Sequence, residues 1–286
     1  MAGVPVTETI VATRLATDSA RAAGRAVALV PTMGALHAGH AELVRVARRL
    51  AGPSGFVVVS IFVNPTQFGP GEDFDRYPRA LEADRRLCGE AGADLIFHPS
   101  VAEVYPGRPL AYVEVGEHGD HLCGPSRPGH FRGVCTVVLK LLNIVRPDLS
   151  VFGAKDAQQV RILRRMVADL NAPGRVEVAP TVREPDGLAM SSRNAYLSAT
   201  ERAVAPRIYA ALLATRDRVA AGEADAAALE AALHAELAAI PGARVAYASV
   251  VDDETMQPIT RVEGPALVAV AVHLGRTRLI DNLTVS

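Results

Sequence analysis

The stretch Val27-Ala-Leu-Val-Pro-Thr-Met-Gly-Ala-Leu-His-Ala-Gly-His40 decides the fold. Its apolar run, Val27–Val30, predicts a buried strand, and Gly34 and Gly39 allow the backbone to turn tightly behind that strand. A helical pattern follows at Ala41–Leu50. A buried strand, a glycine-containing loop and a helix in this order indicate the start of a β-α-β unit.

The same alternation continues through the first two thirds of the chain. Continuous apolar runs that alternate with amphipathic segments predict an α/β fold, with a parallel sheet covered on both faces. The crossovers are expected to be right-handed, and ligands gather at the carboxyl ends of the strands. The further strands are expected at Phe56–Val63, Asp94–Phe97, Leu149–Phe152 and Val176–Ala179, and the helices at Ala80–Ala91, Thr136–Val145 and Ala157–Leu170.

The pattern changes near residue 184. A polar loop, Arg183–Asn194, is followed by two Ala-rich helical patterns at Ala199–Ala221 and Ala224–Ala239. Segments with an alternation of period 2 come last, at Val245–Val251, Ala266–Leu274 and Arg278–Leu283. We therefore expect one domain at 1–184 and a smaller α+β domain at 185–286.

The composition excludes several classes of protein. With 286 residues, 49% hydrophobic residues and a formal net charge of −1, the chain is globular and has no extended nucleic-acid or membrane-surface footprint. Its three cysteines, Cys88, Cys123 and Cys135, show no metal-ligand spacing and suit a reducing cytosol. We find no secretory signal and no apolar stretch of the roughly 20 residues that span a membrane, so we expect a soluble cytoplasmic protein.

The first candidate site is the histidine loop behind the first predicted strand. A helix that starts near Gly39 would point backbone N–H groups and its positive dipole end toward a phosphate. His37 and His40 would share one face of its first turn and donate hydrogen bonds to phosphoryl oxygens. The alternative is a turn with two solvated histidines; a metal site is less favoured, because no third ligand lies nearby in the sequence.

Two further segments carry groups suited to phosphate. Lys155, in Gly153-Ala-Lys155-Asp156, follows a predicted strand and supplies a mobile point charge, although such a loop is also ordinary turn chemistry. Met190-Ser-Ser-Arg193 offers hydroxyl donors and a planar guanidinium in a long polar loop that could close over a site and exclude water. The alternative for this loop is a solvated surface segment.

Neutral amides point to an acceptor that is not phosphorylated. Asn64 and Gln67 follow the second predicted strand, and Gln159 lies one turn into a helix. A pair of glutamines suits a hydroxy acid, although Asn64 before a proline is also a common turn starter. Arg127 and His130 are further candidates for phosphate contact, or they belong to a structural turn with a salt bridge.

Together these segments resemble the pantothenate synthetase (pantoate–β-alanine ligase) family of the nucleotidylyltransferase group. The motifs VPTMGALHAGH, FVNPTQF, YPR, RPGHFRGV, GAKDAQQ and TVREPDGLAMSSRN follow in this order over nearly the whole chain. The resemblance implies a Rossmann-like doubly wound parallel sheet with a smaller α+β C-terminal domain that acts as a lid and is associated with a homodimer. It also implies ATP-dependent condensation of (R)-pantoate with β-alanine through a pantoyl adenylate, which releases AMP and pyrophosphate.

The resemblance also assigns roles to residues. The implied catalytic residues are His40, His37, Lys155, Arg193 and Ser192. The implied ATP-binding residues are Met33, Gly34, Ala35, Leu36, His37, Ala38, Gly39, His40, Gly153, Ala154, Lys155, Asp156, Val182, Met190, Ser191, Ser192 and Arg193. The implied substrate-binding residues are Gln67 for pantoate and β-alanine, Gln159 for pantoate, and Arg127 and Asn64.

The chain departs from the family pattern in two places, and the metal ligands stay open. Ala154 stands where the family usually has Glu, and Ala157 where it usually has Tyr. We expect an altered nucleotide affinity rather than lost activity, because Lys155, Asp156 and Gln159 remain. Family members use Mg²⁺ with ATP; Asp84 is a candidate for approaching it, and the phosphates and water could also hold most of it.

Two other functions remain as alternatives. A nucleotidylyltransferase acting on a phosphorylated acceptor would carry an extra cluster of Lys and Arg, where this chain has Gln67 and Gln159. A non-catalytic nucleotide-binding protein would have lost site residues, whereas both histidines, Lys155 and Arg193 are present.

Overall fold

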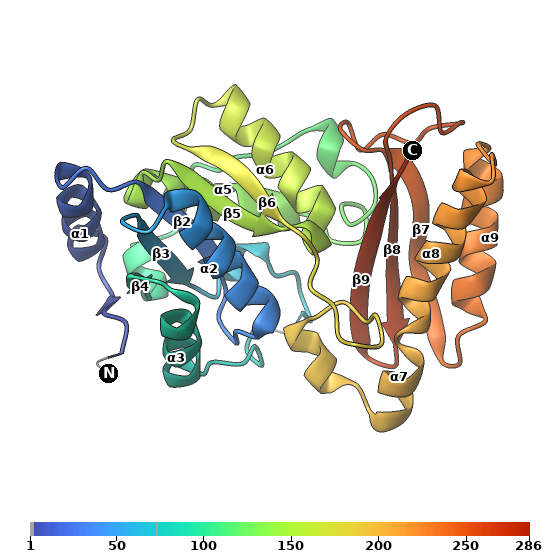
Figure 1. Cartoon of the computed structure of the whole chain (residues 1–286), viewed down its shortest axis with the longest axis horizontal. Coiled ribbons are helices and arrows are strands. Elements are labelled where there is room, and N and C mark those ends of the chain that lie inside the picture. Colours follow the sequence, from blue (N-terminus) through green and yellow to red (C-terminus); the bar gives the residue numbers. More distant parts are fainter. Residues whose placement is uncertain (1–2, 73) are drawn as a thin grey trace. The chain divides into compact units, whose positions relative to one another are not determined.

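The five apolar runs form strands of one sheet in the computed structural model, which describes residues 3–72 and 74–286 (Figure 1). Neighbouring strands are parallel, in the order β1-β4-β3-β2-β5-β6. This confirms the predicted doubly wound α/β sheet. The strands are Val6–Thr7 (β1), Val27–Thr32 (β2), Phe56–Ile61 (β3), Leu95–Phe97 (β4), Leu149–Gly153 (β5) and Arg175–Ala179 (β6).

Helices cover both faces of this sheet. On one face, α2 and α3 bury small and β-branched side chains such as Val44, Ala47 and Cys88 against the strands. α1 and α5 lie together against the other face, and α5 is buried along most of its length (Figure 1). The helices are Ile10–Ala22 (α1), Ala38–Ala51 (α2), Leu81–Ala91 (α3), Val101–Val104 (α4), His130–Val145 (α5) and Ala157–Asp169 (α6).

The N-terminal β1 and α1 are absent from the sequence-based expectation. On α1 the usual pattern is inverted, because Val11 and Leu15 are 68% and 65% exposed whereas Thr13 and Thr17 are buried. Thr13 satisfies its hydroxyl by donating to the Thr9 carbonyl at 2.9 Å. A search for apolar residues at helical spacing therefore finds no buried face in this segment.

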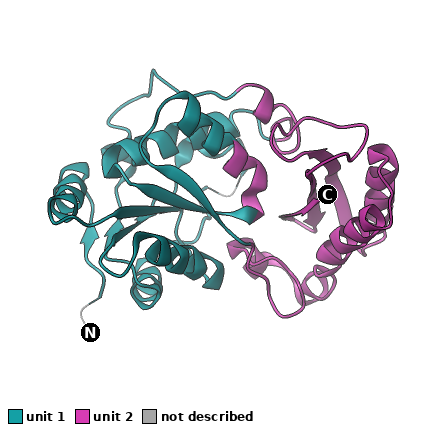
Figure 2. Cartoon of the chain, turned by 45° about the horizontal axis from the view of Figure 1, so that its top comes forward, with its two compact units in different colours: residues 1–115, 127–154, 162–180 teal, residues 116–126, 155–161, 181–286 magenta. Residues whose placement is uncertain are grey.

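The chain divides into two compact units that interleave along the sequence (Figure 2). Unit 1 comprises residues 1–115, 127–154 and 162–180, and unit 2 comprises residues 116–126, 155–161 and 181–286. The division at residue 184 stays a prediction about domains. Each unit has its own hydrophobic core.

Unit 2 packs two helices against a three-stranded antiparallel sheet, as expected for an α+β arrangement. Leucines of α8 and α9, among them Leu212, Leu229 and Leu233, meet alternate valines of the central strand β8. The elements are Ala199–Val204 (α7), Arg207–Ala220 (α8), Ala226–Ala238 (α9), Ala243–Asp252 (β7), Ala266–Leu274 (β8) and Thr277–Val285 (β9). Within the part of the chain that the structure describes, no helix is long and apolar enough to cross a membrane.

The expected single helix Ala199–Ala221 is wrong. The first helix, α7, ends at Val204, and α8 starts at Arg207 behind Pro206. A proline has no N–H to continue a helix, but it is well tolerated where a new helix begins. Its carbonyl accepts from Tyr209 and Ala210 at 3.1 and 3.2 Å, which opens α8.

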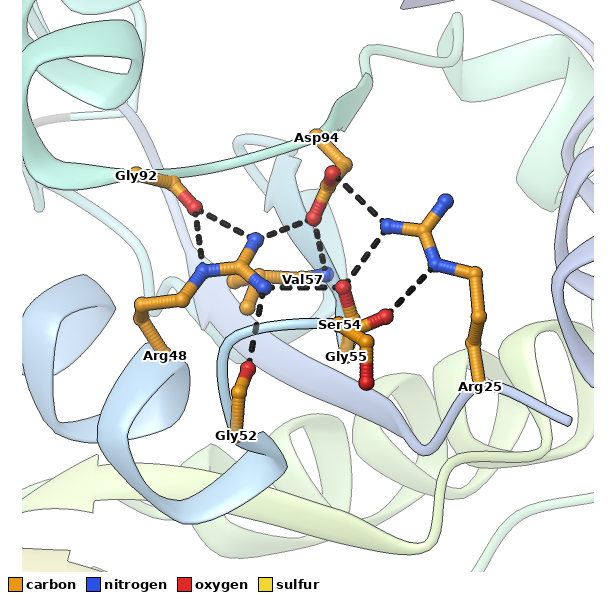
Figure 3. A network of polar contacts seen from close by, with 8 residues as sticks. All are labelled: Arg25, Arg48, Gly52, Ser54, Gly55, Val57, Gly92 and Asp94. Atoms are coloured by element: carbon orange, nitrogen blue, oxygen red, sulfur yellow. Dashed lines mark hydrogen bonds and ion pairs between the residues drawn. The ribbon is translucent and has the colours of Figure 1, made fainter.

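An ion-pair network ties together the amino ends of β2, β3 and β4 (Figure 3). The Asp94 carboxylate accepts hydrogen bonds from Arg25 at 3.0 Å, from Arg48 and from the Val57 backbone N–H at 2.8 Å. Both guanidinium groups also donate to the Gly55 carbonyl, at 2.7 and 2.8 Å. The network thus connects strands that are far apart in the sequence.

We predict that Asp94→Ala destabilises the protein by roughly 1–3 kcal/mol, between the values for exposed and buried ion pairs. The three side chains of the network are only 24–33% exposed, so two guanidinium groups would lose a half-buried partner. Urea unfolding at neutral pH measures the difference. Asp169→Ala is the control, because it removes an exposed partner of Arg165 and should change stability little; an equal loss in both variants would contradict the prediction.

Candidate active site

In unit 1 the carboxyl ends of β2 and β5 lie side by side, and both strands lead into the predicted site. β2 pairs with β3 on one side and with β5 on the other, all in parallel. From β2 the chain continues to β3 on one side of the sheet, and from β5 it continues to β6 on the other side. The direction in which strands are added therefore reverses between β2 and β5. Ligands of such sheets bind at the carboxyl ends of the strands at this switch point. The chain leaves β2 there through Met33–His37 and leaves β5 there at Gly153.

The two histidines cap the helix that leaves this edge. α2 begins at Ala38, with His37 as its N-cap and His40 in its first turn. The His37 ring accepts from the Gly39 N–H at 3.1 Å, and the His40 ring accepts from the His37 N–H at 3.3 Å. The two ring centroids lie 4.2 Å apart. The structure thus brings the predicted pair together on one face of the helix end.

These contacts determine which ring nitrogen carries the proton. Both backbone groups are donors, so Nδ1 of His37 and Nδ1 of His40 are the acceptors. A neutral imidazole with Nδ1 as acceptor carries its hydrogen on Nε2. Both rings therefore carry their hydrogen on Nε2, and an N–H group of this kind can stabilise charge on a phosphoryl oxygen.

Asp84 of α3 binds the backbone of the loop that precedes His37. The carboxylate accepts from Leu36 N–H at 2.7 Å and from Ala35 N–H at 3.0 Å. Asp84 is 2% exposed, and this burial raises the pKa of its carboxyl, against the effect of the two hydrogen bonds. Both oxygens thus bind the backbone, and the approach of Asp84 to Mg²⁺ stays a prediction.

Gln67 ends the short 3₁₀ helix η1 (Pro65–Gln67) with its amide orientation set by Asn64. The Asn64 Nδ2 group donates to Gln67 Oε1 at 3.0 Å and to the Gly133 carbonyl at 3.2 Å. Its Oδ1 accepts from Thr66 and from the Tyr105 hydroxyl at 3.0 Å. Asn64 is 1% exposed, whereas Gln67 is half-buried and points its Nε2 toward Met33 Sδ at 3.3 Å. The geometry favours a positioning role for Asn64.

Arg127 and His130 form a second support for Gln67. Arg127 makes a two-fold ion pair with Glu72, at 2.7 Å for both bonds, and lies 2.8 Å from His130 Nε2. An arginine only donates, so Nε2 accepts and Nδ1 of the neutral ring donates to the Gln67 carbonyl at 2.9 Å. Burial raises the pKa of Glu72, but the hydrogen bonds and charge of Arg127 outweigh it and hold that pKa below its ordinary value.

Lys155 and the paired glutamines follow β5 within unit 2. Lys155 lies half-buried in the 3₁₀ turn η3 (Ala154–Asp156), and its carbonyl accepts from Asn282 at 2.8 Å. Gln158 is buried, donates to the His118 and His121 carbonyls and accepts from the Cys123 N–H. Gln159 is half-buried instead, so the two neighbouring glutamines differ in their surroundings. Ala157, one of the departures from the family pattern, packs with Val251, Met256, Leu267 and Ala269.

The predicted serine–arginine loop has a defined conformation in unit 2. Met190 N–H donates to the Val182 carbonyl at 3.0 Å, which pairs the two ends of a hairpin. Ser191 then caps η4 (Ser192–Tyr196) by accepting from the Arg193 N–H at 3.2 Å. Ser191, Ser192 and Arg193 are all half-buried. The hairpin base is held by Arg183, which pairs with Asp281 at 2.6 Å and lies over the Tyr209 ring.

Two of the three cysteines and the arrangement of metal-binding side chains can be described directly. Burial raises the pKa of Cys88 and of Cys135 to about 12, so both are thiols at neutral pH. Within residues 3–72 and 74–286, no group of three or more His, Cys, Asp or Glu side chains could hold a metal ion.

Comparison with known proteins agrees with this arrangement. The sequence model described as pantoate-beta-alanine ligase matches residues 5–284. The pantothenate synthetase of Pelotomaculum thermopropionicum is 51% identical, with 97% of each chain covered. The crystal structure of pantothenate synthetase from Thermus thermophilus is 46% identical with a TM-score of 0.90, covering 98% of this chain and 99% of that one.

A third relative was solved with small molecules. The pantoate-beta-alanine ligase of Francisella tularensis, described as complexed with beta-gamma ATP and beta-alanine, is 33% identical with a TM-score of 0.80 and covers 98% of this chain and 97% of that one. The family match extends over nearly all of the chain, and the relatives align over nearly their full length. The chain belongs to the pantoate–β-alanine ligase family.

Proposed function

We propose that the chain, a pantoate–β-alanine ligase by family, condenses (R)-pantoate with β-alanine through a pantoyl adenylate. The observation that carries this proposal is the pair of histidines at the start of α2, at the switch point of the sheet. Two Nε2–H donors at a helix N-terminus suit the α-phosphate of ATP. The complex of the Francisella tularensis relative supports ATP and β-alanine as substrates.

In the first step the pantoate carboxylate attacks the α-phosphorus of ATP in line, a P–O bond forms, and pyrophosphate leaves. A carboxylate is already ionised at neutral pH, so this step needs no general base. It requires placement of the reactants and compensation of negative charge. His37 and His40 donate to the phosphoryl oxygens, and Lys155, Ser192 and Arg193 contribute further donors.

In the second step the free amine of β-alanine attacks the carbonyl carbon of the adenylate and AMP leaves. The amine loses a proton as the amide bond forms, and no covalent bond to the protein is made. Gln67 orients both acids with its Nε2 group, and Gln159 orients pantoate. Uncharged amides suit the hydroxyl and carboxylate groups of pantoate and disfavour a phosphorylated acceptor, as in the alternative nucleotidylyltransferase reaction.

Three further proposals follow from the family. Mg²⁺ enters with ATP as part of the substrate, held by phosphates and water, since the described residues offer no cluster of metal ligands. The chain works in the cytoplasm as a homodimer. The C-terminal region acts as a lid that keeps water from the adenylate.

The direct test is pyrophosphate release from ATP and Mg²⁺, first with pantoate alone and then with β-alanine added. We expect a burst of about one equivalent with pantoate, because the adenylate stays bound, and steady turnover to AMP and pantothenate after β-alanine is added. Folded, ATP-binding protein that releases no pantoate-dependent pyrophosphate would reject the function. Release with phosphorylated acceptors instead would favour the nucleotidylyltransferase alternative.

We predict that His40→Ala lowers kcat by about 10²–10³, the usual cost of losing one donor to a developing oxyanion. His234→Ala is the matched control, because His234 is exposed on α9, and it should keep full activity. Steady-state pyrophosphate release measures both. A loss below about threefold in His40→Ala would place His40 outside the chemistry.

Glu72→Gln tests the support of Gln67. Losing the ionised partner of Arg127 should raise the KM of pantoate about two- to tenfold, as expected for one net hydrogen bond. Because the pKa of Glu72 is lowered in the folded state, its contribution to stability is present above about pH 4.5 and lost as the pH falls through the folded pKa.

Urea unfolding should therefore give a lower free energy of unfolding for Glu72→Gln than for wild type at pH 7. In acid the two free energies should become equal. Glu90→Gln, an exposed position on α3, is the control at each pH. A stability gap that grows on acidification would contradict this assignment, as would an unchanged KM.

A further inference from the structure

Asp84 is unusual among the acidic side chains of unit 1, because it is almost fully buried and both its oxygens bind successive backbone N–H groups. Its side chain comes from the first turn of α3, and the two groups that it binds belong to Ala35 and Leu36. The residue itself is 2% exposed. The contact joins parts of the chain that are 48 and 49 residues apart.

The loop that Asp84 binds has an unfavourable backbone conformation. Gly34 and Ala35 are both left-handed, with φ of 85° and 53°. A Cβ on Gly34 would lie 3.0 Å from Ile61 Cγ2 and 3.1 Å from Asp84 Oδ2. Ala35 carries a Cβ in this conformation, which residues other than Gly, Asn and Asp rarely adopt. Such backbone persists only where its surroundings hold it.

The geometry also explains why the support must be an ionised carboxylate. The two N–H groups point to different oxygens, at 2.7 Å for Oδ1 and 3.0 Å for Oδ2. A carboxylate accepts at both oxygens, whereas a carboxamide accepts at one and places an NH₂ against the other donor. A buried N–H without an acceptor is costly.

The loop leads directly into the helix cap. Leu36 precedes His37, the N-cap of α2, whose ring and N–H take part in both capping hydrogen bonds. A rotation of the backbone at Ala35 would therefore turn the direction in which both Nε2–H groups point. Asp84 is thus connected to the two histidines through this backbone.

We propose that Asp84 is a positioning residue for the reaction: its buried carboxylate holds the left-handed turn at Gly34–Ala35 and thereby aims His37 and His40 at the phosphate. The identity of that phosphate as ATP rests on the proposed function. The conformation of the loop is independent of that function.

The experiment is a double-mutant cycle of Asp84→Asn and Ala35→Gly, with Glu82→Gln as the control from the exposed side of the same helix turn. Asp84→Asn keeps the size of the side chain and removes one acceptor. Glycine adopts φ near 53° without strain, so Ala35→Gly reduces the need for support. The readouts are kcat and KM for ATP and β-alanine, and hydrogen exchange of the Ala35 and Leu36 amides in the ligand-free protein.

We expect Asp84→Asn to lower kcat/KM for ATP about ten- to a hundredfold, with the KM of β-alanine unchanged. Exchange at Ala35 and Leu36 should accelerate while amides of β2 and β3 stay protected. Adding Ala35→Gly to Asp84→Asn should recover part of kcat/KM, although the same change should bring no gain in the wild type. Glu82→Gln should behave as wild type.

Two results would overturn the proposal. One is Asp84→Asn with unaltered exchange at Ala35 and Leu36. The other is a loss of activity that follows a general loss of amide protection and that Ala35→Gly does not relieve, which would make Asp84 a structural residue only. A wild type without pantoate-dependent pyrophosphate release would defeat the proposed function, whereas the exchange data would still decide the role of Asp84.

Discussion

The parallel pairing of β2 with β5 is the interaction on which the rest of the site depends. Ala28 and Leu29 are opposite Leu149 and Ser150, and the pairing is anchored by Asp148. The Asp148 carboxylate accepts from the Val27 N–H at 2.7 Å, and its own N–H donates to the Val27 carbonyl at 2.8 Å. These bonds join strands separated by more than a hundred residues and bring their carboxyl ends to one edge of the sheet. Neither strand end would be near the other without this pairing.

The sequence predicted the inner strands β2, β3, β4 and β5 well because most of their residues are buried. They read as largely apolar runs, and the helices between them show clear periodicity. The prediction failed where buried positions are not apolar or where an apolar pattern contains a break. In α1 two threonines are buried and two large apolar residues are exposed, and in α7–α8 a proline marks the start of a second helix inside a continuous Ala-rich pattern.

At the candidate site, the residues that follow strand ends could be predicted from the sequence, whereas the supporting contacts of Asp84 and Glu72 could not. Glycines and histidines behind β2 form a local pattern with a local explanation. Asp84 and Glu72 act on segments 48 to 55 residues away, so no spacing reveals them. The paired glutamines show the same limit. Gln158 anchors the segment around residue 120 and Gln159 does not, although the two are neighbours with the same chemistry.

The histidine cap of α2 has a consequence for the behaviour of the protein in acid. Each ring uses Nδ1 to accept a backbone N–H, so a second proton on either ring would set one N–H against another. The ring would then have to turn away, and the first turn of the helix would lose a cap. Both capping hydrogen bonds therefore require rings whose Nδ1 carries no hydrogen. The start of α2 and the tautomer of its two histidines are thus set by the same pair of contacts.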